Sequence, residues 1–211
     1  DQAGARKAIN VDPDIPFILF VGRIQPLKGP DVAIRALAAL GRSDAQLAIV
    51  GGASGSNGDV QSSEARALVD ELGLHDQVQF IDPKPHHILS TWYRAADIVL
   101  VPSRSESFGL VALEAAACGV PVVASAVGGL VSLVDDGETG YLIEGRKPAD
   151  YADAMRTILN DSELAASMAK AAVERAKAYT WRAAAERLLE VYAELGVGTL
   201  ITCHDAAEAL T

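Results

Sequence analysis

Short apolar runs alternate with amphipathic segments along most of this chain. Six runs predict β-strands, and the first of them, PFILFV, is apolar on both faces, which is typical of a buried parallel strand. The predicted strands cover residues 16–21, 46–50, 77–81, 97–101, 120–124 and 141–143.

The segments between these runs predict helices. Pro30 opens one helix, its apolar residues recur at helical spacing, and Gly41 ends it. Further helices are predicted at about 60–72, 87–95, 110–118, 148–160, 162–178 and 181–194. Strands and helices that alternate in this way predict an α/β fold, a Rossmann-like doubly wound parallel sheet of about six strands. Residues 196–211 show no clear pattern.

Composition narrows the classes of partner. The chain has 211 residues, a net charge of −10 and a hydrophobic fraction of 50%, which is typical of a globular protein. The acidity argues against nucleic acid and anionic membranes as partners. No apolar run has the length of a transmembrane segment, and the two cysteines, Cys118 and Cys203, favour free thiols over a disulfide. A soluble, cytoplasmic protein is predicted.

Ligands of such sheets bind outside the carboxyl ends of the strands. The first loop there, GRIQPLKG (22–29), is neither a dinucleotide fingerprint nor a triphosphate cradle. It begins with Gly22 and carries Arg23 and Lys28, two cations that suit a diphosphate, although a surface loop with solvated charges is the alternative. The loop GGASGSNG (51–58) is either a phosphate-holding nest or a plain surface loop.

A single acid interrupts the longest apolar stretch. Glu114 is the only charged residue between Phe108 and Val134, in a predicted helix whose apolar residues cover every face and which is therefore expected to be buried. An unpaired buried carboxylate costs several kcal/mol. Either a ligand's vicinal hydroxyls satisfy it, or backbone amides or a basic neighbour do so.

The segment just before this helix adds further polar groups. Glu106 precedes it, and Phe108, Gly109 and Leu110 enter the helix with backbone N–H groups that form an anion site. This edge therefore offers a carboxylate, an amide cluster and a second carboxylate, facing Arg23 and Lys28. A nucleotide sugar has matching groups: sugar hydroxyls, a diphosphate and a ribose diol.

These motifs resemble those of retaining glycosyltransferases of family four, which have the GT-B fold. ESFGLVALE (106–114) looks like the family's Glu-x7-Glu motif, and GRIQPLK (22–28) looks like its donor-phosphate loop. YRAAD (93–97), ACGVPVV (117–123) and DGETGYL (136–142) also fit. Within the family, GRIQPLKGPD, GGASG and DPKP are most similar to members that act on inositol phosphate, and sucrose-phosphate-synthase-like members are near relatives.

The resemblance implies roles for particular residues. Arg23 and Lys28 would hold the diphosphate and stabilise the leaving UDP, and Glu106 would bind hydroxyls of the donor sugar. Glu114 would bind the ribose, and Lys84 would lie near the uracil. The remaining donor contacts would come from the backbone of Gly22, Phe108, Gly109 and Leu110. No metal and no cofactor are implied, only a UDP-sugar substrate.

The resemblance covers one half of a GT-B enzyme. Residues 1–195 match the carboxyl-terminal, nucleotide-sugar-binding domain, and 196–211 form a tail of unknown structure. The acceptor domain is absent, so the chain is expected to bind the donor but not to transfer a hexosyl group, N-acetylglucosaminyl being one candidate. A stand-alone binding module without catalysis, a sucrose-phosphate-synthase-like transferase and an epimerase of the same architecture are the alternatives.

Overall fold

The computed structural model describes residues 1–53 and 58–196. Contacts divide the chain into two units, residues 1–176 and 177–211. The tail predicted to follow residue 195 lies, apart from Gly196, outside the described residues, as does Cys203. The assignment of residues 1–195 to one domain stays a prediction.

The first unit is built on a six-stranded, fully parallel sheet. Its strand order is β3-β2-β1-β4-β5-β6, so β1 and β4 are neighbours at the centre although three helices separate them in the chain. This confirms the doubly wound α/β prediction. The strands are β1 Phe17–Val21, β2 Gln46–Val50, β3 Val78–Ile81, β4 Ile98–Val101, β5 Val122–Ser125 and β6 Gly140–Ile143.

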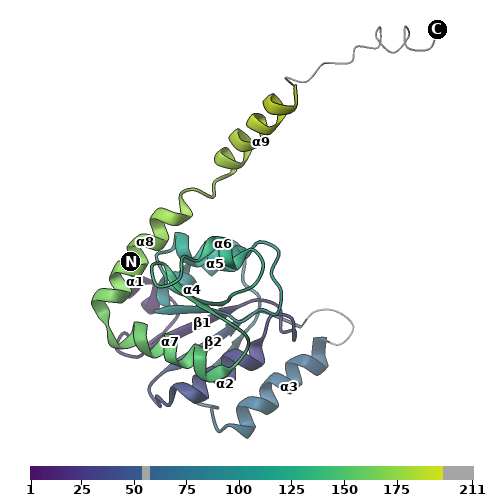
Figure 1. Ribbon diagram of the computed structural model, residues 1–211. Helices are drawn as coiled ribbons and strands as arrows, with labels where there is room; N and C mark the ends of the chain where they lie inside the picture. The colour runs from purple at the N-terminus through teal and green to yellow at the C-terminus, as the bar shows by residue number, and fades with distance from the viewer. Residues whose placement is uncertain (54–57, 197–211) are drawn as a thin grey trace, which may run out of the picture. The chain divides into compact units, whose positions relative to one another are not determined.

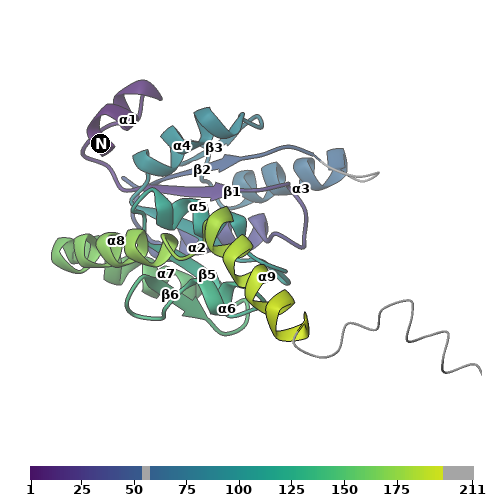
Figure 2. The same ribbon diagram turned by 90° about the horizontal axis from the view of Figure 1, so that it is seen from above.

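Helices cover both faces of this sheet, with α1, α4 and α5 on one face and α2, α3 and α7 on the other (Figures 1 and 2). This arrangement follows from the right-handed crossovers between parallel strands. Helices of the first unit are α1 Gln2–Ala8, α2 Pro30–Leu40, α3 Gly58–Glu71, α4 His86–Ala95, α5 Leu110–Ala117, α6 Leu130–Leu133, α7 Pro148–Asn160 and α8 Ser162–Ala176.

Two short helices were not predicted from the sequence. Helix α1 is a seven-residue helix capped by Asp1, whose side chain accepts a hydrogen bond from the Gly4 amide at 2.7 Å. Helix α6 has only four residues. Both are too short to show a clear 3.6-residue period, which is why the apolar pattern did not reveal them.

A buried arginine fixes the first segment to the sheet. Arg6 is 5% exposed, and its guanidinium lies 2.7 Å from a carboxylate oxygen of Asp97, at the start of β4. It also donates to the carbonyls of Ala95, Pro13 and Ile15. The Asp97 carboxylate in turn accepts from the Phe17 amide at the start of β1. One charged pair thus joins α1 to both central strands.

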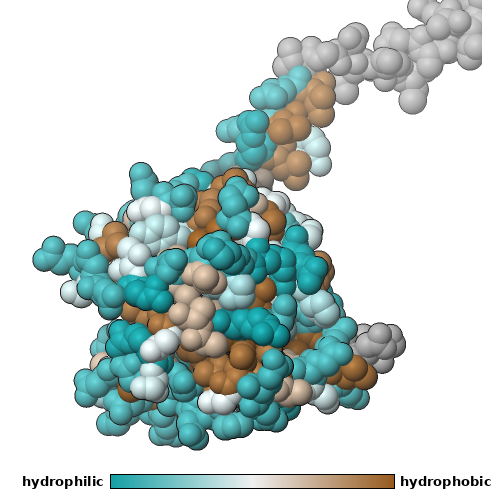
Figure 3. Space-filling model, turned by 60° about the horizontal axis from the view of Figure 1, so that its bottom comes forward, coloured by the Kyte–Doolittle hydropathy of each residue, from teal (hydrophilic) through white to brown (hydrophobic). Residues whose placement is uncertain are grey.

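The second unit is described from Lys177 to Gly196 and contains helix α9, Trp181–Gly196. Figure 3 shows apolar side chains gathered along one side of this helix. The exposed large apolar or aromatic residues of α9 include Leu188, Leu189, Tyr192 and Leu195. The amphipathic helix predicted at 181–194 is therefore confirmed. No helix of the described ranges is long and apolar enough to span a bilayer.

Candidate functional site

Strands β1 and β4 are parallel neighbours, so the loops that follow them leave the same edge of the sheet side by side. From this point the chain continues toward β2 on one side and toward β5 on the other. This is the place where open parallel sheets bind ligands. The Arg104 amide donates to the Leu27 carbonyl at 2.8 Å, and the Arg104 guanidinium donates to the Pro26 carbonyl at 3.2 Å. Two segments almost eighty residues apart in sequence therefore form one surface.

Glycine makes this close approach possible at the end of the first loop. Gly29 has a φ of 75°, and a Cβ atom added there would lie 2.3 Å from the Pro102 carbonyl oxygen. Arg146, which follows β6, fastens the same point, since it donates to the Pro102 carbonyl at 2.9 Å and to the Asp31 carboxylate at 3.2 Å. The loops after β1, β4 and β6 are thus tied together.

The two loops bring Lys28 and Glu106 into direct contact. The Lys28 Nζ atom lies 2.6 Å from Oε2 of Glu106, and the two side chains are 20% and 17% exposed. Ser103 adds a weak hydrogen bond to the same carboxylate oxygen. The pair lies in a small recess walled by Phe20, Val101 and Val111, among other residues. Sequence reasoning placed Glu106 and Lys28 at one edge but did not predict that they pair.

Arg23 lies on the same loop with a different environment. Its side chain is exposed, and within residues 1–53 and 58–196 no ion pair to it is seen. The loop backbone that carries it is fixed, because the Ile24 amide donates to the Gly52 carbonyl at 3.0 Å. Gly22, at the start of the loop, packs against Gly51, where an added Cβ would lie 1.8 Å from the Gly22 carbonyl oxygen. Residues 54–57 of the second glycine-rich loop lie outside the described residues.

Helix α5 begins next to the Lys28–Glu106 pair. Its N-cap is Gly109, with a φ of 101° and no side-chain cap, so the first-turn amides have no side-chain acceptor at the cap. The loop after β5 supports this entry from behind. Gly129 donates to the Glu106 carbonyl at 2.9 Å, and an added Cβ there would lie 2.3 Å from the Phe108 carbonyl oxygen. A cation, a carboxylate and a helix amino terminus therefore share one edge.

The prediction that the helix around Glu114 is buried on every face is wrong. Only Ala112, Ala115 and Ala116 of α5 are buried, whereas Leu110 is 61% exposed. The helix packs against β4 and β5 and also against α8, but its first turn reaches the surface, so its apolar composition does not report burial on every face.

Glu114 is accordingly only partly buried and has a partner within the protein. Its side chain is 31% exposed, and Oε2 accepts a hydrogen bond of 2.7 Å from the hydroxyl of Tyr93 on α4. Oε1 lies 3.5 Å from Nδ1 of the exposed His86. Glu114 faces a hollow of about 260 Å³, which shares no lining residue with the recess of Lys28 and Glu106.

The pKa of Tyr93 is raised above its ordinary value, mainly by burial and in addition by the nearby Glu114 carboxylate. The phenol therefore stays protonated and donates its hydrogen bond throughout the physiological range. Lys84 lies exposed in the loop between β3 and α4, two residues before His86. His86 begins α4, one residue before the predicted start of this helix.

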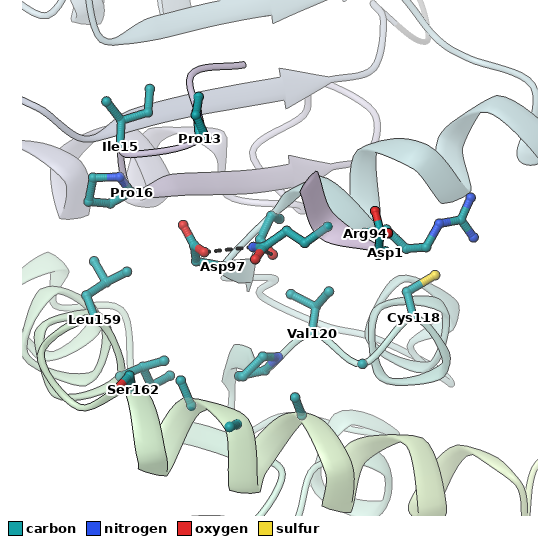
Figure 4. A pocket seen from close by; sticks show the side chains of 18 of the residues that line it. Asp1, Pro13, Ile15, Pro16, Arg94, Asp97, Cys118, Val120, Leu159 and Ser162 are labelled. Carbon is teal, nitrogen blue, oxygen red and sulfur yellow. Dashed lines mark hydrogen bonds between the residues drawn. The ribbon is translucent and has the colours of Figure 1, made fainter. Parts of the chain in front are cut away.

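A second, larger hollow lies at the opposite, amino edge of the strands. It measures about 660 Å³ and is shown in Figure 4. Its polar groups do not converge on a ligand, because Asp97 accepts from Gln2 at 2.9 Å as well as from Arg6, and Arg94 donates to Ser90. The carboxyl edge is the better candidate for a ligand site, because it has the exposed side chain of Arg23 and the amino terminus of α5. Among the described residues, no group of three or more His, Cys, Asp or Glu side chains could hold a metal ion.

A family model described as "Glycosyl transferases group 1" matches residues 1–175, most of the chain. The chain belongs to this family. This confirms the family resemblance that the motifs at 22–28 and 106–114 indicated, with the fold expected for a GT-B half.

Relatives of this glycosyltransferase chain include a D-inositol 3-phosphate glycosyltransferase from Kribbella flavida, 49% identical over 199 residues, which cover 91% of this chain and 46% of the relative. Among solved structures, sucrose-phosphate synthase from Thermosynechococcus elongatus has a TM-score of 0.85 at 38% identity, over 93% of this chain and 49% of the other. Anabaena HepE, in complex with UDP and glucose, has a TM-score of 0.83 at 26% identity, over 90% and 51%. The chain therefore spans about half the length of the relatives it matches.

Sequence reasoning missed several residues that shape this candidate site. Tyr93 was noted only as part of a motif, and Arg146 was not singled out at all. The glycine pair at 128 and 129 was not assigned a role. Glycines that repeat at a predicted loop are a usable signal of close backbone approach, but nothing in sequence marks the partner of Tyr93 or of Arg146.

Proposed function

We propose that this chain is the donor-binding half of a retaining glycosyltransferase that moves a hexosyl group from a UDP-sugar to an acceptor such as inositol phosphate. The observation that carries the proposal is the Lys28–Glu106 pair, held at 2.6 Å beside the amino terminus of α5 at the central edge of the sheet. The names of the inositol phosphate relatives and the UDP bound to HepE support the substrate class.

The diphosphate is proposed to bind between the loops that follow β1 and β4. Lys28, Arg23 and the first-turn amides of α5 all carry positive charge or partial positive charge toward one edge. Negative charge builds up on the UDP phosphate when the bond to the sugar breaks, and groups of this kind stabilise it without reorganisation. Lys28 and Arg23 are therefore proposed to assist departure of the leaving group, without a metal.

Glu106 has a second role in this proposal. It holds Lys28 in the recess, and its other oxygen remains available to accept hydrogen bonds from hydroxyls of the donor sugar. Glu114 lies in a neighbouring hollow and is proposed to bind the ribose, with Lys84 toward the base. The backbone at Gly22 and at residues 108–110 would complete the contacts. The acceptor enters from the half of the enzyme that this chain does not contain, so the chain alone is expected to bind UDP without transfer.

Calorimetric titration with UDP tests this directly. We expect binding to the wild-type chain, and Lys28→Ala should weaken it roughly ten- to a hundredfold, the range for a lost hydrogen bond to a charged group. Lys170→Ala, on the exposed side of α8, is the matched control and should bind UDP normally. A wild-type chain that releases no binding heat with UDP would refute the proposal. Equal weakening by both lysine variants would refute the role of Lys28.

A further inference from the structure

Tyr93 and Glu114 join two helices that follow different strands. The hydroxyl of Tyr93, on α4, donates to Oε2 of Glu114, on α5, at 2.7 Å. The tyrosine is 2% exposed, and Trp92 beside it packs on Phe17, so the end of α4 is fixed against the sheet. A buried phenol needs a hydrogen-bond partner, and here the partner is an acid that reaches the surface.

The two oxygens of this carboxylate have different surroundings. Oε2 is held by the buried phenol, whereas the distance from Oε1 to His86 Nδ1, 3.5 Å, is too long for a strong hydrogen bond. His86 is itself 88% exposed. The hollow of about 260 Å³ in front of Glu114 is walled by Leu89, Ser90 and Ala117, among others. One oxygen is thus fixed from within while the other is presented outward.

Orientation is the property that such a contact provides. A glutamate on an exposed helix edge samples several rotamers, and ordering it on binding costs free energy. A hydrogen bond from a fixed donor removes part of that cost before the ligand arrives. Each carboxylate oxygen has two acceptor sites, so the bond from Tyr93 still leaves capacity on both oxygens for a pair of hydroxyls.

We propose that Tyr93 is a positioning residue that orients Glu114 to accept the vicinal hydroxyls of a ribose. The inference rests on the proposed function, which places Glu114 against the nucleoside. Tyr93 also lines the hollow, but its hydroxyl is bonded to Glu114, and its role is to act through that carboxylate. Its effect is confined to the contact between Glu114 and the diol, and affinity for the diphosphate and the base does not depend on it.

The experiment compares UDP with 2′-deoxy-UDP, which lacks one hydroxyl of the diol. Calorimetry on the wild-type chain should show UDP binding roughly tenfold more tightly. Tyr93→Phe should reduce this preference to about threefold or less by weakening UDP alone. Glu114→Gln should likewise reduce it. Tyr151→Phe is the matched control, since Tyr151 is also buried and its hydroxyl bonds Ser125 at 2.7 Å. That variant should keep the full preference.

The outcomes separate the two proposals. If Tyr93→Phe retains the wild-type preference for UDP, the positioning role is wrong while the donor-binding function stands. If the wild-type chain binds neither nucleotide, the proposed function is wrong. Equal weakening toward both nucleotides by Tyr93→Phe would show a merely structural tyrosine and would also overturn the inference.

A measurement on the unaltered chain covers the case in which Tyr93→Phe fails to fold. The hydroxyl proton of Tyr93, buried and hydrogen-bonded to Glu114, should give a slowly exchanging proton resonance. It should persist when UDP saturates the site, because the phenol keeps its partner in the complex. Disappearance of that resonance on UDP binding would overturn the inference, since Tyr93 would then no longer hold the carboxylate.

Discussion

Substitution of Gly29 by alanine tests how the loops after β1 and β4 are held together. Gly29 is the N-cap of α2, adopts a left-handed conformation, and lies against Pro102. Gly41, at the other end of the same helix, has nearly the same φ, 70° against 75°, but an added Cβ there would meet no heavy atom within 4 Å. The two glycines therefore differ in the close approach and not in the strain of their backbone.

The expected costs follow from this difference. Alanine in the left-handed region costs about 1–2 kcal/mol, and the loss of glycine's freedom in the unfolded chain returns about 0.4–1 kcal/mol. Gly41→Ala should thus destabilise by about 1 kcal/mol. At Gly29 the new methyl would also lie 2.3 Å from the Pro102 carbonyl oxygen, so the loops must separate by roughly 1 Å. Weakening one or two hydrogen bonds between these loops adds about 1–3 kcal/mol.

Urea unfolding of the two variants and the wild-type chain measures these values. We expect Gly29→Ala to be less stable than Gly41→Ala by about 1–3 kcal/mol. A parallel titration with UDP adds a functional reading. Gly29→Ala should weaken UDP binding because it moves Lys28 away from Glu106, whereas Gly41→Ala should not. Equal losses of stability, together with unchanged UDP affinity in both, would show that the contact between Gly29 and Pro102 does not hold the site.

Two further predictions concern the ion pair of Arg6 with Asp97 and the thiol of Cys118. Asp97→Asn should lower the free energy of unfolding by about 3 kcal/mol, because it leaves the buried Arg6 without its counter-ion. Urea unfolding measures this loss, and a change below about 0.5 kcal/mol would contradict the prediction. Burial raises the pKa of the Cys118 thiol, the charge of Arg94 offsets part of this rise, and the Glu114 carboxylate adds to it, so less thiolate is present at a given pH than in a free thiol. In a Cys203→Ser background, Glu114→Gln should move the pH midpoint of alkylation downward, and an upward shift would contradict the assignment.

The strands and long helices could be predicted because their signals are local. PFILFV predicted a strand at 16–21, and β1 is observed at 17–21; the helix opened by Pro30 ends at Leu40 with Gly41 as its left-handed cap. Proline and glycine act through their own φ angles, so neighbours are not needed to interpret them. The right-handed crossovers then set which face of the sheet each helix covers, but the strand order itself was not predicted.

The pairing of polar groups could not be predicted in the same way. Lys28 and Glu106 both lie at the carboxyl edge, which the order of elements predicts, but whether they contact each other depends on how far two loops reach toward one another. The reach is set by Gly29 against Pro102 and by Arg104 against Leu27, contacts between residues more than seventy positions apart. Tyr93 and Glu114 pose the same problem, because a helix period does not say which side chain of the next helix it will meet.

Helix α5 shows where hydropathy misleads for a physical reason. Apolar residues indicate that a surface is removed from water, but not by what. Leu110 is 61% exposed and Phe108 is 43% exposed, and both lie at the end of α5 nearest to Lys28 and Glu106. Leu27 and Val131, on the adjoining loop and helix, are also exposed apolar residues. Apolar groups around a charged recess are typical of a ligand site that is completed from outside. Because the chain spans about half the length of its relatives, this rim supports the proposal that the acceptor enters from the half of the enzyme that this chain does not contain.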